Sequence, residues 1–344
     1  MRCRSHENVS GADQRQMSEG NTLEYFEKKY HAKPDIAYHY TSLEAFMSIV
    51  QSKTFRLTSL SMSNDKSELS YSPDQFRSDF NKATKGHACH ARFASNSDKA
   101  FNEICVKGKT EKVFSLSLTS AKDNLMHWRA YGDQGKGVCI CFNCGALYSM
   151  YAKLNCADIV NNLCWKAYAL YDEASRIDFI KKKMDLLCEV LSDKVVSVFS
   201  EVLTAEILNS LYSLLQICTK QACFADEKEA RCVFQQANVP MCKGLVEIVK
   251  NQLQAQNDKA YEQLKRNVNN AIKKIGIENE GYYLSQYGIK SYRNLCLEEV
   301  WGSGVIPEVI LGPLCRQNVT ELTSFLESNG LYGVEIRESK VPIR

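Results

Sequence analysis

The chain has 344 residues, of which 44% are hydrophobic and 24% charged, and its formal net charge is +3. This length is enough for one large or two small domains, and the composition is ordinary for a soluble globular protein. A charge so close to neutral gives no indication of the strongly basic surface on which binding to nucleic acid or membranes depends.

The N-terminal segment is polar. Residues 1–21 lack the apolar core of a signal peptide, and no apolar run in the chain reaches the length that spans a bilayer. We therefore expect a cytoplasmic protein, with a disordered terminus and no membrane partner. A disordered terminus is also compatible with secretion as an effector without a cleaved signal peptide.

The chain contains 15 cysteines. An odd number, in a long chain without a secretory signal, predicts reduced thiols that act as small buried hydrophobic groups. The cysteines between Cys139 and Cys144 alternate with apolar residues in a strand-like run. His87, Cys89 and His90 lie in a polar stretch typical of a surface loop. Because neither group is completed by a second pair of ligands at zinc spacing, no metal site is predicted.

Short strands and helices alternate in the first half of the chain. The capping-box spacing of Thr41 and Glu44 predicts a helix through Val50, and that of Ser120 and Asp123 predicts a short helix after them. Strands are predicted at 36–40, 55–58, 113–118, 138–142 and near 231–234, where β-formers cluster or apolar and polar residues alternate.

Helical periodicity dominates the later part of the chain. Apolar residues recur at steps of three and four over 180–202, which predicts one long helix, and over 207–215 and 245–275. A helix at 322–326 and a strand at 332–336 are expected near the end. The pattern predicts an α+β fold in which residues 22–344 form a single domain. Helical insertions at about 172–220 and 241–280 would lie against a mixed or antiparallel sheet.

Several short motifs resemble, in their order, a bacterial family of unknown function, the domain-of-unknown-function family 2971. They are Tyr38-His39-Tyr40-Thr41-Ser42, Arg56-Leu57-Thr58, Asn64-Asp65 with Glu68, Trp128 with Tyr131-Gly132 and Gly137, Phe224 with Glu227, Glu229 and Arg231, Val309–Pro313 and Ser339–Arg344. The resemblance spans nearly the whole chain from Ile36. The sequence departs from the family pattern at Ala230, where an aromatic residue is common, and in a longer helical stretch at 241–275.

A first-strand His, a central Ser/Tyr segment and a late Glu also resemble the His-Tyr-Glu type of the ADP-ribosyltransferase superfamily. That resemblance implies a split mixed sheet that grips NAD as a substrate, with Glu229 as the catalytic carboxylate and Glu227 as the alternative. A fixed carboxylate stabilises the positive charge that develops on the ribose as the nicotinamide bond breaks. His39 would orient NAD, since a neutral imidazole offers one donor and one acceptor.

The same resemblance implies a set of residues that contact NAD: His39, Tyr40, Thr41, Arg56, Ser115, Ser117 and Tyr131. Tyr131 is expected to stack on the nicotinamide, with Tyr40 as the competitor. The two serines would line the strand beneath the ring, and the planar fork of Arg56 would pair with a phosphate.

Each of these residues also has a purely structural interpretation. His39 could be a hydrogen-bonded histidine near a strand end, and the serines could form the polar face of a half-buried strand. Glu229 could pair with Arg231 across one face, and Arg56 could form a surface ion pair. Trp128 is expected in the core. The segment from Asn64 to Glu68 is expected to be an Asx-capped turn and not a cation site.

Three functions follow from these alternatives. The first is an NAD-dependent ADP-ribosyltransferase that modifies a macromolecule. A protein is the preferred acceptor, and for a secreted effector it would be a host protein; a nucleic acid acceptor is the alternative. That activity would suit a toxin, an effector or an antiphage defence protein. The second is a non-catalytic module that binds a nucleotide or a protein. The third is an NAD glycohydrolase, in which water is the acceptor.

Overall fold

The computed structural model describes residues 36–63, 65–86, 112–146, 164–191, 200–235, 280–285 and 288–342, together with residues 262, 266, 269 and 270. Within these residues, ten strands form one mixed sheet. The strands are β1 (Ile36–Thr41), β2 (Thr54–Ser59), β3 (Val113–Thr119), β4 (Val138–Asn143), β5 (Cys164–Tyr168), β6 (Glu229–Gln235), β7 (Glu280–Ser285), β8 (Gly288–Cys296), β9 (Glu308–Leu311) and β10 (Glu335–Glu338). The predicted α+β class is confirmed.

The sheet divides at β3. Its main path is β10-β9-β4-β1-β3-β2-β8-β7, and β6 with β5 branches from β3. Along one edge β3 pairs with β6 over its whole length. Along the other edge, β2 pairs with the start of β3, at Phe114 and Ser115, whereas β1 pairs only with its end, at Thr119. The three residues 116–118 therefore face a gap between two diverging strands.

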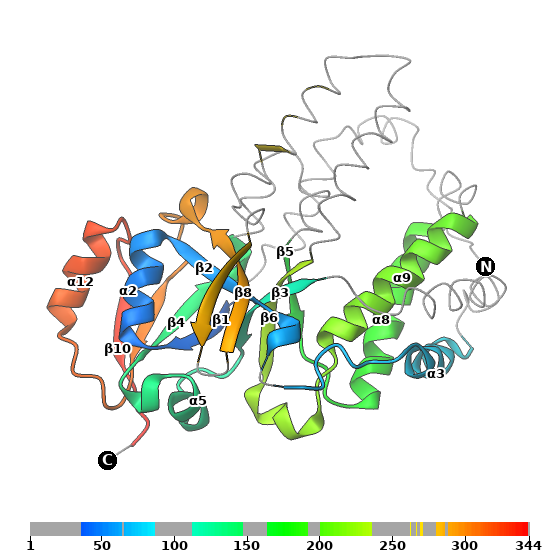
Figure 1. The fold of residues 1–344 in the computed structure, drawn as a ribbon, viewed down its shortest axis with the longest axis horizontal. Coiled ribbons are helices and arrows are strands. Elements are labelled where there is room, and N and C mark those ends of the chain that lie inside the picture. The colour runs from blue at the N-terminus through cyan, green and yellow to red at the C-terminus, as the bar shows by residue number, and fades with distance from the viewer. Residues whose placement is uncertain are drawn as a thin grey trace, which may run out of the picture.

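The alternation of side chains along β3 and β6 separates a core face from a polar face. Leu116 and Leu118 of β3 and Cys232 of β6 point into the main hydrophobic core. This core also contains residues of α2 (Leu43–Ser52) and α12 (Val319–Ser328), which lie on the same side of the fold in Figure 1. Since successive strand residues point to opposite faces, Ser117 and Arg231 face the other side.

A second, helical core lies beside the branch of the sheet. It is formed by α3 (Pro73–Thr84), α8 (Glu173–Leu191) and α9 (Ser200–Cys218), which pack together at the right of Figure 1. A buried ion pair between Arg176 and Asp79, at 2.7 Å, joins α8 to α3. The predicted helix over 180–202 coincides with α8 up to Leu191 and with α9 from Ser200, and residues 192–199 between them lie outside the described residues.

Two predicted helix starts were displaced by one residue or more. The N-cap of α2 is Ser42, whose hydroxyl accepts a hydrogen bond from the Ala45 amide, so Thr41 belongs to β1. The N-cap of α5 (Leu125–Ala130) is Asn124, because its side-chain oxygen accepts the amides of Met126 and His127.

Some further elements begin at other residues than predicted, some were not predicted, and some predicted features lie outside the described residues. The last strand, β10, begins at Glu335 and not at Tyr332. Polar or short patterns concealed α3, β5, β7 and β8. The His87–His90 cluster, Asn64, residues 1–21 and most of the expected helix over 241–280 lie outside the described residues. Burial is described for eight of the cysteines, and five of these eight are buried. No helix there is long and apolar enough to cross a membrane.

Two motif glycines allow close backbone approach beside β1. A side chain at Gly137 would come within 2.1 Å of the Thr41 carbonyl oxygen, and one at Gly312 within 2.3 Å of the Gly135 carbonyl oxygen. The Gly312 amide donates to the Gly137 carbonyl at 2.9 Å. The segment after α5 is thereby held against the ends of β1 and β9.

The closing motif is anchored beneath α5. Asp123 accepts hydrogen bonds from the Trp128 indole at 2.8 Å, the Lys340 amide at 2.8 Å and the Ser339 hydroxyl. Burial raises the pKa of Asp123, but these hydrogen bonds more than offset it and hold that pKa below its ordinary value. Trp128 is fully buried, as predicted for a core residue.

Candidate functional site

A cavity of about 420 Å³ lies at the gap between β1 and β2. Its walls come from β1, β2, β3, β6, β7 and β8, from α5 and the adjoining Tyr131, and from the segments 60–68 and 220–227; β7 and β8 contribute Tyr283 and Lys290. This volume is within the range of small-molecule sites. Seven of the nine predicted site residues line it: His39, Tyr40, Ser115, Ser117, Tyr131, Glu227 and Glu229.

His39 occupies the gap in the sheet. Its Nδ1 lies 3.1 Å from the Ser117 carbonyl oxygen, which belongs to the stretch of β3 that neither β1 nor β2 covers. A carbonyl oxygen can only accept, so Nδ1 carries the proton and Nε2 of the neutral ring is an acceptor. Burial lowers the pKa of His39, although the Ser117 carbonyl opposes this. The ring packs edge-on against Phe55.

The two candidate tyrosines are placed very differently. Tyr40 is buried, and its hydroxyl donates to the Ala121 carbonyl at 3.0 Å and accepts from the Asn124 amide at 2.9 Å. Its ring packs against Trp128 at a centroid distance of 4.8 Å. Tyr131 keeps 44% of its surface exposed at the cavity. Tyr40 therefore has a structural role in orienting the loop before α5, whereas Tyr131 offers a ring face to a ligand.

Glu227 and Glu229 do not share a strand. Glu227 ends the short 3-10 helix η5 (Ala222–Glu227), Lys228 adopts a left-handed conformation with φ 44°, and Glu229 begins β6. The two carboxylates therefore do not project from one face of a single strand. They meet instead at Lys220, whose ammonium lies 2.5 Å from Glu227 and 2.7 Å from Glu229.

The two carboxylates differ in their remaining partners. Glu227 Oε1 accepts the Tyr131 hydroxyl at 2.6 Å, and its side chain is 17% exposed. Glu229 is 6% exposed and is also bound by Arg231 at 2.8 and 2.9 Å. Burial raises the pKa of Glu229, but Arg231 and Lys220 more than offset this, so the pKa falls below its ordinary value.

A buried arginine connects two motifs that are far apart in the sequence. Arg231 has no exposed surface and donates to both oxygens of Glu68 at 2.5 and 2.9 Å, to Glu229 and to the Ile217 carbonyl. The Glu229–Arg231 pairing predicted as the structural alternative is present. Glu68 was expected in a simple turn, yet it also completes this network. The family-like Asn-Asp-x-x-Glu and Glu-x-Glu-x-Arg segments thus meet at one point.

His127 is a site residue that the sequence did not single out. Its Nε2 lies 3.0 Å from the Glu227 carbonyl oxygen, and its Nδ1 lies 3.1 Å from Asn124 Oδ1. Burial lowers the pKa of His127, while its contact with Glu227 opposes that effect. The residue ties α5, and with it Tyr131, to the segment that carries Glu227. Its one sequence signal was a place one residue before Trp128.

Two predicted residues are placed outside the cavity lining. Arg56 lies on an exposed part of β2, where its guanidinium stacks over Tyr292 at 5.0 Å and Tyr283 at 5.9 Å. Thr41 ends β1, paired with Val138. Neither residue therefore contacts the space that a ligand in this cavity would occupy.

Residues 127–232 match the model of a family described as "Protein of unknown function (DUF2971)". This match supports the resemblance to the DUF2971 family that the motifs indicated. No curated protein and no solved structure matches the chain. The matched segment contains Tyr131, Lys220, Glu227, Glu229 and Arg231, which are the late residues of the cavity and of its ion-pair network. The early wall, with His39 and Ser117, precedes the DUF2971 match.

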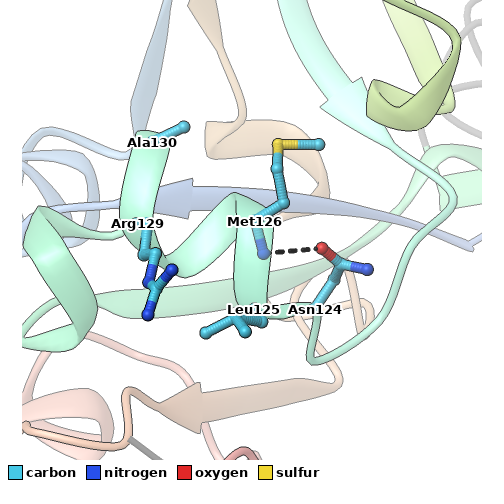
Figure 2. Close-up of a pocket in the computed structure, with 5 residues that line it drawn as sticks. All are labelled: Asn124, Leu125, Met126, Arg129 and Ala130. Carbon is cyan, nitrogen blue, oxygen red and sulfur yellow. Dashed lines mark hydrogen bonds between the residues drawn. The ribbon is translucent and has the colours of Figure 1, made fainter.

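A second depression, of about 560 Å³, lies along α5 and is drawn in Figure 2. It is lined by Asn124, Leu125, Met126, Arg129 and Ala130, all from one short helix and its cap. The only contact drawn between these residues is the capping hydrogen bond from the Met126 amide to Asn124. Because no other element contributes a wall, this surface lacks the converging polar groups that mark the first cavity.

Proposed function

We propose that this protein is an enzyme that cleaves the nicotinamide–ribose bond of NAD and transfers ADP-ribose to a protein acceptor. The observation that carries the proposal is the convergence of His39, Tyr131 and the Glu227/Glu229 pair on one cavity. These residues come from β1, α5 and the η5–β6 segment, which are separated by long stretches of sequence. A fold that only needed to bury its core would have no reason to bring them together.

The proposed roles follow from the geometry. The exposed ring of Tyr131 stacks on the nicotinamide. The Nε2 acceptor of His39, fixed by the Nδ1 contact with Ser117, receives a ribose hydroxyl. Ser117 itself is exposed on the cavity side of β3. Arg56 has no role in this arrangement, because it lies outside the cavity lining. The pyrophosphate of bound NAD would instead extend towards Lys290, which lines the cavity.

Glu227 is the carboxylate that we assign to catalysis. It is more exposed than Glu229, and one of its partners is the Tyr131 hydroxyl, which is itself at the cavity. Glu229 is committed to Arg231 and Lys220, and its role is to hold Lys220 in place beside Glu227. Glu229 thus acts through Lys220, as a positioning residue.

The chemical step is a displacement at the anomeric carbon of the ribose. The bond between this carbon and the ring nitrogen breaks, and its electron pair stays on the nitrogen, so that nicotinamide leaves as a neutral molecule. The acceptor's nucleophile forms the new bond and releases a proton to solvent or to a nearby base. Glu227 stabilises the positive charge that builds on the ribose in the transition state. With water as the acceptor the same step would be glycohydrolysis.

Release of nicotinamide from NAD tests the proposal. Glu227→Gln removes the charge but keeps the shape, so we expect a fall of about 10²–10³-fold in kcat, typical of losing one transition-state contact. His39→Ala should lower kcat/KM by a similar factor. Labelled NAD in a lysate would then show whether ADP-ribose reaches a protein or only water.

The matched control is Glu298→Gln, on an exposed glutamate that pairs with Lys53 at the surface. It should leave the rate unchanged. If the folded wild type releases no nicotinamide in the presence of lysate, the proposal is wrong. If Glu229→Gln abolishes activity in a stable protein while Glu227→Gln does not, the two carboxylates exchange roles.

A further inference from the structure

The imidazole ring of His127 has an acceptor oxygen facing each of its two nitrogens. Nε2 lies 3.0 Å from the main-chain carbonyl oxygen of Glu227, and Nδ1 lies 3.1 Å from Asn124 Oδ1. A neutral imidazole carries one proton, so it can donate to only one of these oxygens, and at the other contact two lone pairs face each other. Only the imidazolium, which carries both protons, can donate to both oxygens.

The side-chain amide of Asn124 cannot relieve this conflict by turning over. Asn124 is the N-cap of α5, and its Oδ1 accepts from the Met126 amide at 2.9 Å, as Figure 2 shows, and from the His127 amide at 3.3 Å. A rotation by 180° would place the NH2 group against these two donors and would leave them without their acceptor. Oδ1 is therefore fixed as an acceptor towards the ring.

The two oxygens belong to the two segments that carry Tyr131 and Glu227. Asn124 begins α5, and at the other end of this helix the Tyr131 amide donates to the His127 carbonyl at 2.8 Å. The Glu227 carbonyl belongs to the residue whose carboxylate accepts the Tyr131 hydroxyl. The ring of His127 is thus a second link between α5 and the end of η5, and it bears on how firmly Glu227 is held at the cavity.

The groups around the ring set the pH at which it takes up its second proton. Tyr40 of β1 packs against it at a centroid distance of 5.1 Å, and Tyr131 at 6.1 Å. Burial is the largest effect and lowers the pKa of His127; Glu227 opposes it, and Lys228 adds to it, so the pKa lies below its ordinary 6.5. The ring is therefore neutral above pH 6.5 and gains its second proton as the pH falls through the lowered pKa.

We propose that His127 is a positioning residue for Glu227 and acts as a proton-controlled clamp: the imidazolium holds α5 and the Glu227 segment together, and the neutral ring releases one of its two contacts. Its part in catalysis rests on the proposed function. The Thr119 hydroxyl also donates to the Glu227 carbonyl, at 2.7 Å, so the neutral form loosens the segment without detaching it. Closure of the clamp makes the enzyme more active in mildly acidic conditions.

The value of kcat for nicotinamide release, measured from pH 8 to pH 5 in the wild type and in His127→Gln, tests the clamp. The ratio of wild-type to variant kcat should rise about tenfold as the pH falls through the lowered pKa of His127, because a misplacement of about 1 Å can cost 10²-fold in rate. Taking the ratio removes the effect of His39, which titrates in both proteins. A ratio that stays constant over this range overturns the clamp.

Asn124→Asp alters only the acceptor that faces Nδ1. Aspartate caps a helix as well as asparagine does, but its charge should raise the pKa of His127 by about one to three pH units and move the rise in kcat to higher pH. Asn318→Asp makes the same change at the N-cap of α12, where the side chain accepts from the Glu321 amide outside the described cavity lining. It should leave the profile unchanged. A purely structural His127 would give one profile in all three proteins and would overturn the proposal.

NMR titration of the full-length protein with isotope-labelled histidine gives a readout that needs no activity. The signal of His127 is identified by its loss in His127→Gln. One ring proton above the pKa and two below it, with a higher pKa in Asn124→Asp, support the clamp, even if NAD is not cleaved and the proposed function alone is overturned. A pKa of His127 that Asn124→Asp leaves unchanged overturns the clamp. If His127→Gln does not fold, the wild type and Asn124→Asp decide.

Discussion

The hydroxyl of Tyr131 and its ring have separable roles at the cavity. The hydroxyl donates to Glu227 at 2.6 Å, which orients the carboxylate, while the exposed ring offers a stacking surface. One group of this side chain is thus tied to the protein while another is available to the proposed substrate. His39 follows the same pattern, with Nδ1 bound to Ser117 and Nε2 left for substrate. Because the protein already holds one atom of each side chain, the atom available to a ligand is fixed before binding, and the side chain loses no conformational freedom when the ligand binds.

Substitution of Tyr131 separates the two roles. Tyr131→Ala removes the stacking surface, and because stacking of a base on an aromatic ring is worth about 1–3 kcal/mol, KM for NAD should rise roughly 5- to 150-fold. Tyr131→Phe keeps the ring, so it should change KM little and lower kcat through the loosened Glu227. Steady-state kinetics of nicotinamide release measures both values.

The matched control is Tyr332→Ala, because Tyr332 is 76% exposed and is not part of the described cavity lining. It should leave KM unchanged. An unaltered KM in Tyr131→Ala would contradict the stacking role.

Strand β6 serves as both wall and anchor, and Arg231 is the residue on which this depends. One buried guanidinium neutralises Glu229 of its own strand and Glu68 of a distant turn. Glu68, Glu227 and Glu229 together exceed Lys220 and Arg231 by one negative charge when all are ionised. That balance leaves a net acidic wall, as stabilising a cationic ribose requires.

Arg231→Met should therefore destabilise the fold strongly, since it leaves the buried Glu68 without its ion-pair partner and leaves Glu229 with Lys220 alone. We expect a loss of about 3–5 kcal/mol in the free energy of unfolding, the usual cost of breaking a buried ion pair from one side. Arg56→Met is the comparison, because Arg56 is exposed on β2 and its loss should cost about 1 kcal/mol or less. Urea denaturation of both variants measures the difference. Equal stabilities would show that the network is not structural.

At the scale of the whole molecule, the site lies at the gap where β1 and β2 separate and leave the middle of β3 unpaired on one edge. β1 and β2 separate along β3, and helices α3, α8 and α9 cover only the far side of the branch. The resulting cavity is enclosed enough to lower the pKa values of His39 and His127 by burial. Protonation of either ring is therefore coupled to unfolding.

The stability of the protein should fall as the pH drops below about 6.5. In the folded state both histidines have pKa values below their ordinary 6.5. The unfolded state therefore binds more protons in this pH range, and acidification stabilises it relative to the folded state. Their contribution is complete above pH 6.5 and is lost as the pH falls through the lowered values. Glu229, whose pKa is also lowered, adds a further loss below about its ordinary 4.5.

Chemical denaturation between pH 8 and pH 5 measures this slope. The double variant His39→Gln, His127→Gln should show a flatter dependence on pH in that range, even if it is less stable overall. A free energy of unfolding that stays constant from pH 7.5 to 5 in the wild type would contradict the burial of these rings in neutral form.

Local patterns in the sequence determined much of the fold. Clusters of β-forming residues or an alternation of apolar and polar residues were sufficient for β1, β2, β3, β4 and β6, because both signals depend only on neighbouring residues. The same alternation placed Ser115 and Ser117 on one face. Patterns were insufficient for β7, whose side chains are all half-buried or exposed, and for β8, whose buried face includes the polar residues Ser291 and Arg293.

Tertiary structure decided what each candidate residue does. Glu68 and Arg231 are 163 residues apart, and no spacing in the sequence predicts that they pair. Glu227 and Glu229 were indistinguishable until the left-handed Lys228 separated them and Lys220 and Arg231 took up Glu229. The sequence by itself determined which residues could form a site, because residue types and strand faces are local. Only the tertiary structure decided which atoms remain free for a ligand, because that depends on partners brought together from distant parts of the chain.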